Sequence, residues 1–260
     1  MKDKSSSCSS SASNDHHPRF QLSCYYFNAR SLLNKLAELH FLLNSDAYDI
    51  IAVVETWLND KFDDVLMVRN SQFRIFRCDR LSAKQRGGGV ALLVRNAIHA
   101  IFVDSKTFVF GCELLCIDFV TTFKFRLVLV YLPPGCSVRE TREVLEIIEL
   151  WTLIDYPSIV VGDFNYDFTR SHNVSNNLAC FATLFKNFML ASNLFCLSDF
   201  PTRGANFLDS VLTSDLDLID NVIPLPNFST SDHCSIGFAI KSVTHKPCLI
   251  DHYDFERCDW

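Results

Sequence analysis

The stretch SIVVGDFNYDF, residues 158–168, begins as a buried strand and then changes character. Residues 158–161 form the uninterrupted β-branched run that is typical of a strand covered on both faces. A glycine ends this run, and Asp163 and Asn165 follow it. In an extended chain residues i and i+2 point the same way, so we expect these two side chains to project together from the end of a core strand.

Around this stretch, hydrophobic periodicity predicts both strands and helices. Apolar runs indicate strands at residues 20–28, 50–55, 73–78, 90–95, 113–120, 123–131, 206–213, 216–223 and 234–240. Helical spacing indicates helices at 31–44, with Ser31 as the N-cap, at 138–154 and at 178–191. Several strands follow one another too closely for a helical crossover, so the sheets must be mixed. We therefore predict an α/β fold, a four-layer α/β sandwich in which two mixed β-sheets pack face to face with helices outside.

The composition fits one large globular domain. The chain has 260 residues, of which 48% are hydrophobic, and shows no internal repeat. Residues 1–18 are serine-rich and offer little to bury, so we expect a disordered tail followed by a domain over residues 19–241. Eleven cysteines without a CxxC pair, several of them in apolar runs, are typical of reduced core thiols in an intracellular protein. The sequence contains neither a signal peptide nor a run approaching the roughly 18 apolar residues of a membrane span.

Positive charge is concentrated in one region although the net charge is −6. Between residues 69 and 86 six basic side chains stand against one acidic side chain, and they include Arg80, Lys84 and Arg86. This run is either a solvated hairpin face or a strip that contacts phosphates beside an acidic centre.

Polar side chains recur at the ends of the predicted apolar strands. They are Asn28, Glu55, Tyr131, Asp163 with Asn165, Asp209, and the neighbours Asp232 and His233. A single carboxylate at a strand end is usually a turn residue or a helix cap. So many positions with side chains suited to one reaction are harder to explain in that way.

The reaction they suit is metal-assisted hydrolysis of a phosphodiester bond. Mg²⁺ prefers oxygen ligands and is typically held by one or two carboxylates plus the substrate phosphate, and Glu55 is a suitable ligand. Hydrolysis also needs a group that orients or deprotonates water, donors to the phosphorane oxygens and stabilisation of the leaving 3′ oxygen. Those roles can be shared among Asp163, Asn165, Tyr131 and His233. A histidine near a phosphate needs a carboxylate partner, which either Asp209 or Asp232 can supply.

The sequence motifs around these residues resemble those of a known family. The matching segments are FNARSL with Asn28, VVETWL with Glu55, RGGGVALLV from Arg86, VLVYLPPG with Tyr131, VVGDFN with Asp163 and Asn165, PTRGANFLD with Asp209, and SDH with His233. Together they resemble the endonuclease/exonuclease/phosphatase family, and more narrowly the apurinic-type endonuclease domain of non-LTR (LINE-type) retrotransposons. The resemblance runs in order from about residue 20 to residue 240.

The resemblance implies a role for each matching residue. Glu55 is then the principal metal ligand, positioned by Asn28, with Asp232 next to the metal. Asp163 orients or deprotonates the attacking water, while Asn165 helps to hold the phosphate. The remaining roles belong to Tyr131, which contacts the phosphate or the leaving oxygen, and to His233, which stabilises the phosphorane and is paired with Asp209.

Two features differ from the wider family. Some members carry an acidic residue two positions after the first asparagine, where this chain has Arg30, and this puts a second metal in doubt. The tail at residues 242–260 resembles the start of the linker that precedes a reverse transcriptase domain in the longer polyprotein, so we expect a fragment or a domesticated remnant. Arg30, Arg80, Lys84, Arg86 and Arg203 are the candidates for DNA contacts.

The sequence therefore predicts a Mg²⁺-dependent endonuclease, with Mn²⁺ as a substitute ion, that nicks one DNA strand and leaves a 3′ hydroxyl. An enzyme of this kind acting on genomic DNA would be nuclear. Two alternatives remain: a phosphatase or lipid phosphodiesterase of the same fold, and an inactive remnant that binds nucleic acid without catalysis.

Overall fold

The computed structural model describes residues 21–81, 87–167 and 176–241. It contains two six-stranded sheets, and each sheet combines one parallel pair of strands with antiparallel neighbours. The first sheet has the order β11 (Ile219–Leu225), β12 (Ser235–Lys241), β1 (Gln21–Asn28), β2 (Ile50–Val54), β4 (Val90–Arg95), β3 (Phe73–Cys78). The second has the order β5 (Ala100–Thr107), β6 (Glu113–Val120), β7 (Lys124–Tyr131), β8 (Ser158–Asp163), β10 (Asp209–Thr213), β9 (Phe195–Cys196).

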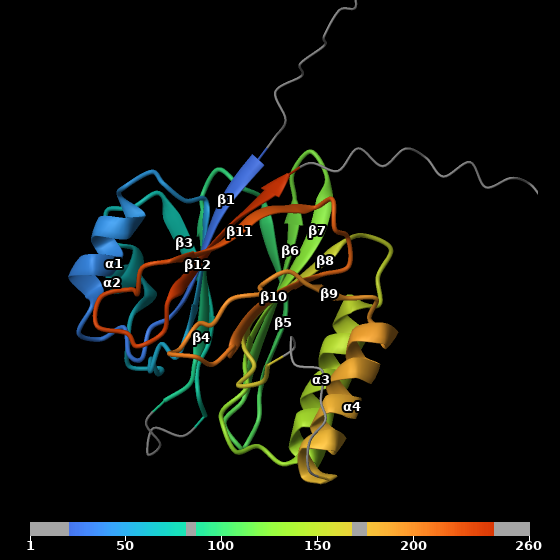
Figure 1. Ribbon diagram of the computed structural model, residues 1–260. Coiled ribbons are helices and arrows are strands. Elements are labelled where there is room, and N and C mark those ends of the chain that lie inside the picture. The colour runs from blue at the N-terminus through green and yellow to red at the C-terminus, as the bar shows by residue number, and fades with distance from the viewer. Residues whose placement is uncertain (1–20, 82–86, 168–175, 242–260) are drawn as a thin grey trace, which may run out of the picture.

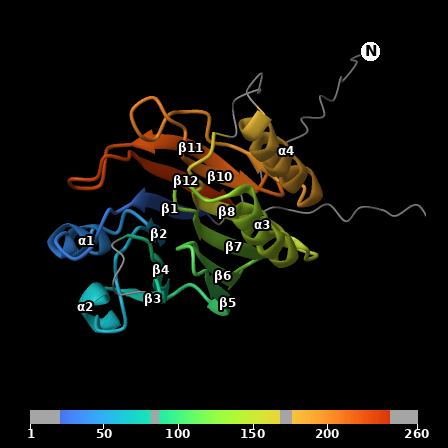
Figure 2. The same cartoon turned by 90° about the horizontal axis from the view of Figure 1, so that it is seen from below.

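The helices lie on the outer faces of the two sheets, as both views show (Figures 1 and 2). Helices α1 (Leu36–Leu43) and α2 (Asp64–Val68) cover the first sheet. Helices α3 (Val138–Thr152) and α4 (Asn176–Ala191) cover the second. The predicted four-layer α/β sandwich is therefore confirmed, and residues 19–241 stay the predicted domain. The tail predicted at 1–18 and the linker fragment predicted at 242–260 lie outside the described residues.

The largest apolar core lies between the sheets. A strand that is buried on both faces contributes alternate side chains to this core and to the core under the helices. On β7, Leu127 and Leu129 face the first sheet, whereas Val128 and Val130 face the helices. At the far end of the intersheet core the rings of Phe119 and Phe125 stack with 4.7 Å between their centroids. Each fully buried side chain of this size stabilises the fold by about 1.5–3 kcal/mol, so the packing of the two sheets is strongly favoured.

Helix α1 is shorter than predicted and does not begin at Ser31. The backbone takes positive φ angles at Arg30 (43°) and Ser31 (83°), and the Ser31 N–H donates to the carbonyl of Glu55 at 2.8 Å. The segment after β1 is therefore tied to the segment after β2, and the helix starts only at Leu36. The prediction was wrong here because the apolar spacing of residues 31–44 does not reveal these long-range backbone bonds.

Three short or exposed elements were not predicted: α2, β5 and β9. Strand β5 is an edge strand whose side chains are mostly exposed, among them Phe102 at 50%. An edge strand of this kind lacks both the buried run and the clean alternation by which strands are recognised. Helix α2 has five residues, which is too short to show helical periodicity.

Three arginines of the basic run at residues 69–86 are bonded to other segments, although Arg69 is exposed. Arg74 donates to two backbone carbonyls just beyond β4. Arg77 pairs with Asp64 at 2.9 Å, and Arg80 pairs with Glu113 at 3.0 Å. The charge count along the chain was misleading because the fold brings acidic partners from other segments. Lys84 and Arg86 lie outside the described residues.

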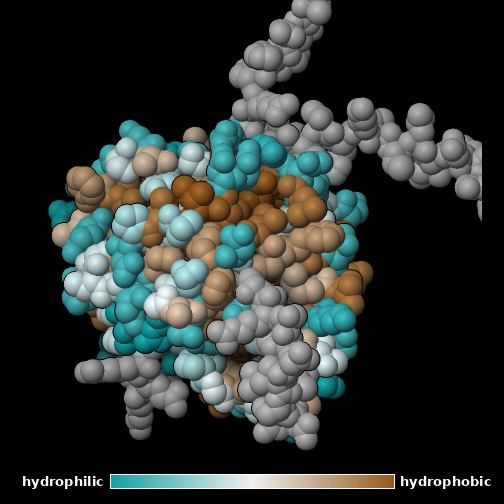
Figure 3. Space-filling model, in the orientation of Figure 1, coloured by the Kyte–Doolittle hydropathy of each residue, from teal (hydrophilic) through white to brown (hydrophobic). Residues whose placement is uncertain are grey.

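The surface combines polar and apolar patches. Figure 3 shows hydrophobic residues gathered over the edge strand β11, where Ile223 is 49% exposed. The part of the chain that the structure describes has no helix both long and apolar enough to cross a membrane. Its eight cysteines are free thiols, and Cys180 is exposed although we expected the cysteines in apolar runs to be core thiols.

Candidate active site

The polar residues singled out in the sequence meet at one edge of the sandwich. Strands β1 and β2 run parallel, as do β7 and β8, so Asn28, Glu55, Tyr131 and Asp163 reach the same edge. Strands β10 and β12 run antiparallel to their neighbours and begin at this edge, at or just after Asp209 and His233. The first sheet thus supplies Asn28, Glu55 and His233, and the second supplies the other three.

Asn28 links the two sheets. Its side-chain amide donates to Glu55 Oε1 at 2.9 Å and to Asp163 Oδ2 at 3.0 Å, while its Oδ1 accepts the N–H of Arg30 at 3.0 Å. The second oxygen of Glu55 accepts from Trp57 Nε1 at 3.3 Å. Because Asn28 is fully buried, these bonds hold two carboxylates from different sheets at a fixed separation.

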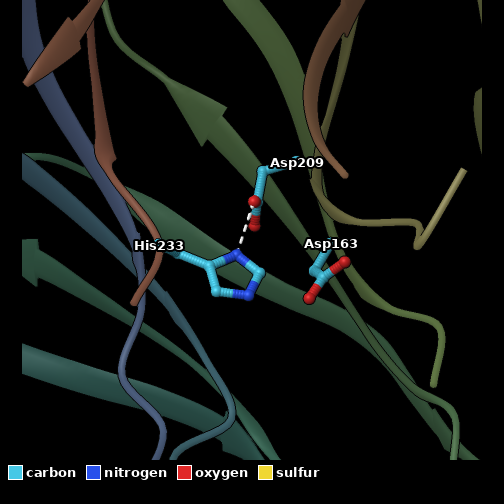
Figure 4. A group of neighbouring side chains, drawn as sticks. All are labelled: Asp163, Asp209 and His233. Carbon is cyan, nitrogen blue, oxygen red and sulfur yellow. Dashed lines mark hydrogen bonds and ion pairs between the residues drawn. The ribbon is translucent and has the colours of Figure 1, made fainter. Parts of the chain in front are cut away.

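Asp209 and His233 form a buried pair beside Asp163 (Figure 4). His233 Nδ1 lies 2.7 Å from Asp209 Oδ2, so the structure selects Asp209 rather than Asp232 as the partner of the histidine. Tyr26 donates to the other oxygen of Asp209 at 2.5 Å. With Nδ1 bonded to a carboxylate, Nε2 of the ring is left for a substrate.

The chain turns sharply after Asp163, and this corrects the expectation that Asp163 and Asn165 project together from extended chain. Strand β8 ends at Asp163, Asn165 has a φ of 48°, and Asp163 Oδ1 accepts the Asn165 N–H at 3.0 Å. The Asn165 side chain turns to donate to the carbonyl of Leu132 at 2.9 Å. The two residues are therefore joined by a turn, in which the carboxylate is fixed by a backbone N–H.

Tyr131 ends β7 directly beside Asp163 in the sheet. Burial, followed by the charges of Glu55 and Asp163, raises the pKa of the Tyr131 hydroxyl far above its usual range. The hydroxyl therefore stays protonated and can donate to a phosphate or leaving oxygen. The guanidinium of Arg80 lies over the ring, 5.8 Å from its centroid.

Asp232 is in contact with two arginines. Its Oδ2 lies 2.8 Å from Arg30 Nη1 and 2.8 Å from Arg203 Nε. The two arginine side chains are 46% and 44% exposed, so both can also reach a ligand at the rim. The pKa of Asp232 is lowered, because hydrogen bonding to Arg30 and the charges of both arginines outweigh the opposing effect of burial.

The site concentrates negative charge. The pKa of the Asp163 carboxyl is raised well above its usual value, first by burial and then by the charges of Asp209 and Glu55. Among the described residues, Asp163, Asp209 and His233 offer ligand atoms that all lie within 4.8 Å of one another. Glu55 reaches this group through Asn28, and its oxygens point to the same edge. The carboxylate oxygens among these groups are donors that fit a hard divalent cation.

Some residues of the site were not predicted as part of it. Tyr26 lies in the middle of an apolar strand, where the sequence gives no sign that its hydroxyl reaches Asp209. Ser231 donates to the carbonyl of Asn28 at 2.7 Å and accepts the N–H of His233, so it fastens the histidine to β1. Only its place in the SDH segment could have indicated that role.

Comparison with known proteins agrees with this arrangement. The model of the endonuclease/exonuclease/phosphatase family matches residues 25–233, which is most of the chain. The chain belongs to the endonuclease/exonuclease/phosphatase family. The family match begins within β1 and ends at His233, so it spans all the strand-end residues described above.

Solved structures show that this family fold is shared at low sequence identity. The AP endonuclease LMAP from Leishmania major is similar with a TM-score of 0.66 at 15% identity, covering 86% of this chain and 88% of that one. The endonuclease domain of TRAS1, a telomere-specific non-LTR retrotransposon, has a TM-score of 0.65 at 17% identity, covering 85% and 98%. The 3′ phosphatase NExo from Neisseria, bound to a product DNA hairpin, has a TM-score of 0.60 at 16% identity, covering 84% and 98%. The search of curated proteins found no match.

Proposed function

We propose that this chain is a Mg²⁺-dependent endonuclease that nicks one strand of DNA and leaves a 3′ hydroxyl. The observation that carries the proposal is the bond of Asn28 to both Glu55 and Asp163, beside the Asp209–His233 pair. This arrangement supports the proposal, because it brings a carboxylate that can act as a base close to a histidine of fixed orientation and to a carboxylate that can bind a metal. Family membership makes phosphoester hydrolysis the expected chemistry.

The residues divide the reaction between them. Asp163 takes a proton from water, and the water oxygen forms a bond to phosphorus as the bond from phosphorus to O3′ breaks. The phosphate stays on the 5′ end of the nick, and O3′ takes up a proton to become the 3′ hydroxyl. His233, held through Nδ1 by Asp209, presents Nε2 to a phosphorane oxygen, and the protonated Tyr131 hydroxyl donates to a phosphate or leaving oxygen.

A cation would be held by Glu55, with Asn28 fixing that carboxylate. When bound, Mg²⁺ supplies charge neutralisation at the phosphate and at the leaving oxygen. Asp232 contacts two arginines through Oδ2, and its Oδ1 has no hydrogen-bond partner among the described residues. Its place next to the metal stays a prediction. We infer that Arg30 and Arg203 contact DNA phosphates and that Asp232 sets their spacing. Asn165, whose amide is fastened to Leu132, contributes its remaining donor to the phosphate.

The wider biological setting is also a proposal. The similarity to the TRAS1 domain supports an origin in a non-LTR retrotransposon, in which the 3′ hydroxyl would prime a reverse transcriptase carried on the same polyprotein. Such an enzyme acts on genomic DNA and would work in the nucleus.

The direct test is the relaxation of supercoiled plasmid. With Mg²⁺ the protein should convert the plasmid to the open circular form, and a DNA polymerase should extend the nick without prior treatment of its 3′ end. EDTA should stop the reaction. Asp163→Ala and His233→Ala should each lower the rate by at least about 100-fold, since each removes a proton-transfer or charge-stabilising group. Glu143→Gln, a change on the exposed face of α3, should leave it unchanged.

Three outcomes would contradict this proposal. Nicking by both alanine variants at the parent rate would exclude the mechanism. Hydrolysis of a phosphoinositide or sphingomyelin without any nicking would favour the lipid phosphodiesterase alternative. Release of phosphate from a 3′-phosphorylated DNA end without nicking would favour a phosphatase, the activity named for the Neisseria protein.

A further inference from the structure

Glu113 is a buried carboxylate that has no part in the mechanism above. It is the first residue of β6, lies beside Tyr131 in the sheet and is fully buried. Its Oε1 accepts from Arg80 Nε at 3.0 Å and its Oε2 accepts the N–H of Gly89 at 3.0 Å. A buried ion pair is weak evidence for stability, because loss of hydration offsets the attraction. The position of this pair, at the site edge of the sheet, points to another role.

The surrounding backbone is shaped around the guanidinium of Arg80. Arg80 Nη2 also donates to the carbonyl of Gly111. Gly88 and Gly111 both have positive φ angles, and a Cβ atom would lie 2.3 Å from Arg80 Nη2 at Gly88 and 2.9 Å from it at Gly111. A side chain at either position would displace the guanidinium, so the bonded position of Arg80 depends on glycine at both.

The backbone of Gly88 and Gly89 also holds the segment that carries Glu55. The carbonyl of Gly89 accepts the N–H of Thr56 at 3.1 Å, and the carbonyl of Gly88 accepts the N–H of Trp57 at 3.0 Å. Glu55 itself has a φ of 52°, which a non-glycine residue adopts only where its surroundings enforce it. The Arg80–Glu113 pair is therefore connected to the Glu55 segment through Gly88 and Gly89. It is connected to Tyr131 because the Arg80 guanidinium lies over the ring.

We propose that Arg80 and Glu113 are positioning residues of the nuclease site, which together fix the Glu55 segment and the Tyr131 ring. This inference rests on the proposed nuclease function. It also reassigns Arg80, which the sequence suggested as a DNA contact. The Arg80 side chain is only 13% exposed, whereas those of Arg30 and Arg203 are more than three times as exposed.

The test compares Arg80→Gln, Arg80→Lys and Glu113→Gln in the full chain. We expect kcat for plasmid nicking to fall by about 10- to 100-fold in all three, since small displacements of reacting groups have effects of this size. The Kd for DNA should stay within about twofold of the parent, and the slope of log K against log salt should not change. Arg80→Lys should not restore kcat, because a lysine ammonium group cannot reproduce the bonds of the planar guanidinium to Glu113 and to the Gly111 carbonyl.

The matched control is another buried ion pair on β6, the strand that carries Glu113. Asp118 and Arg126 form a buried ion pair between β6 and β7 at their opposite ends, with 2.7 Å between Asp118 Oδ1 and Arg126 Nε. Asp118→Asn should lower the Tm about as much as Glu113→Gln but leave kcat within about twofold of the parent. A fall in kcat that is no larger for Glu113→Gln than for Asp118→Asn would overturn the inference.

A direct DNA contact would give a different pattern. Loss of one phosphate contact in Arg80→Gln should reduce the salt slope by about 0.9 and weaken DNA binding, and Arg80→Lys should restore most of both. That pattern would also overturn the inference. If the unchanged protein does not nick DNA at all, the proposed function fails and the inference fails with it. Should Glu113→Gln not fold, the two Arg80 variants still separate these outcomes.

Discussion

Asp163 is a buried carboxylate placed where its charge is disfavoured. Its side chain is 1% exposed, and it lies in register with Asp209 on the neighbouring strand. Burial and the charges of Asp209 and Glu55 raise its pKa, against the opposing hydrogen bonds from Asn165 and Asn28. A base must be ionised to accept a proton, so the ionised form of Asp163 that the mechanism needs costs stability in the absence of a cation or substrate.

The raised pKa makes the contribution of Asp163 to stability dependent on pH. A carboxyl group whose pKa in the folded state exceeds its unfolded value of about 3.9 contributes stability below that value and loses it as pH rises through the folded pKa. In EDTA, the free energy of unfolding of the parent minus that of Asp163→Asn should therefore fall as pH rises from about 4, by up to about 1.4 kcal/mol per pH unit.

Urea unfolding at a series of pH values would measure this difference. Asp217→Asn, which removes one exposed carboxylate, controls for the loss of a charge. A difference that rises with pH would mean that Asp163 is more easily ionised in the folded protein than in the unfolded one.

At the scale of elements, the sequence was most informative where strands are buried. Strands β4 and β6 have the predicted bounds, because a largely apolar, buried run has few alternatives in a mixed α/β fold. The bounds of the half-buried β3 were also predicted. Periodicity cannot predict segments held by distant backbone bonds. The positive φ angles at Ser31 and Asn165 are examples, since each depends on a bond to another segment of the site.

The pairing of β7 with β8 depends on Gly162. A Cβ atom at this position would lie 1.9 Å from the carbonyl oxygen of Val130 on β7, and a backbone atom cannot move aside without disturbing the sheet. Gly162→Ala should therefore lower the free energy of unfolding by about 3 kcal/mol or more and displace Asp163, the next residue. Gly135→Ala is the matched control: its φ is 86° but no atom lies near, so it should cost about 1–2 kcal/mol. Chemical denaturation would measure both losses. Equal losses of free energy of unfolding in the two variants would show that close packing of β7 against β8 at Gly162 does not matter for stability.

At the scale of the molecule, the site exists only because two sheets pack against each other. Asn28, on the first sheet, bonds Asp163 on the second, and Asp209 on the second bonds His233 on the first. The sequence and the family resemblance identified these residues, but not all of their partners. The contact of Asp232 with Arg30 and that of Arg80 with Glu113 each join segments that only the fold brings together.

Substitutions at two neighbouring valines can distinguish the effect of sheet packing on activity from the effect of overall stability. Val160 and Val161 are both fully buried on β8, but Val161 faces the first sheet and Val160 faces the helices. Replacing either by alanine removes two methyl groups and should cost about 2 kcal/mol. Only Val161→Ala loosens the contact that sets the separation of Asn28 and Asp163, so its kcat for nicking should fall about tenfold, against less than about twofold for Val160→Ala. Denaturation curves and nicking rates at a temperature where both variants are folded would test this. Equal falls in kcat would show that the site does not depend on how closely the two sheets pack.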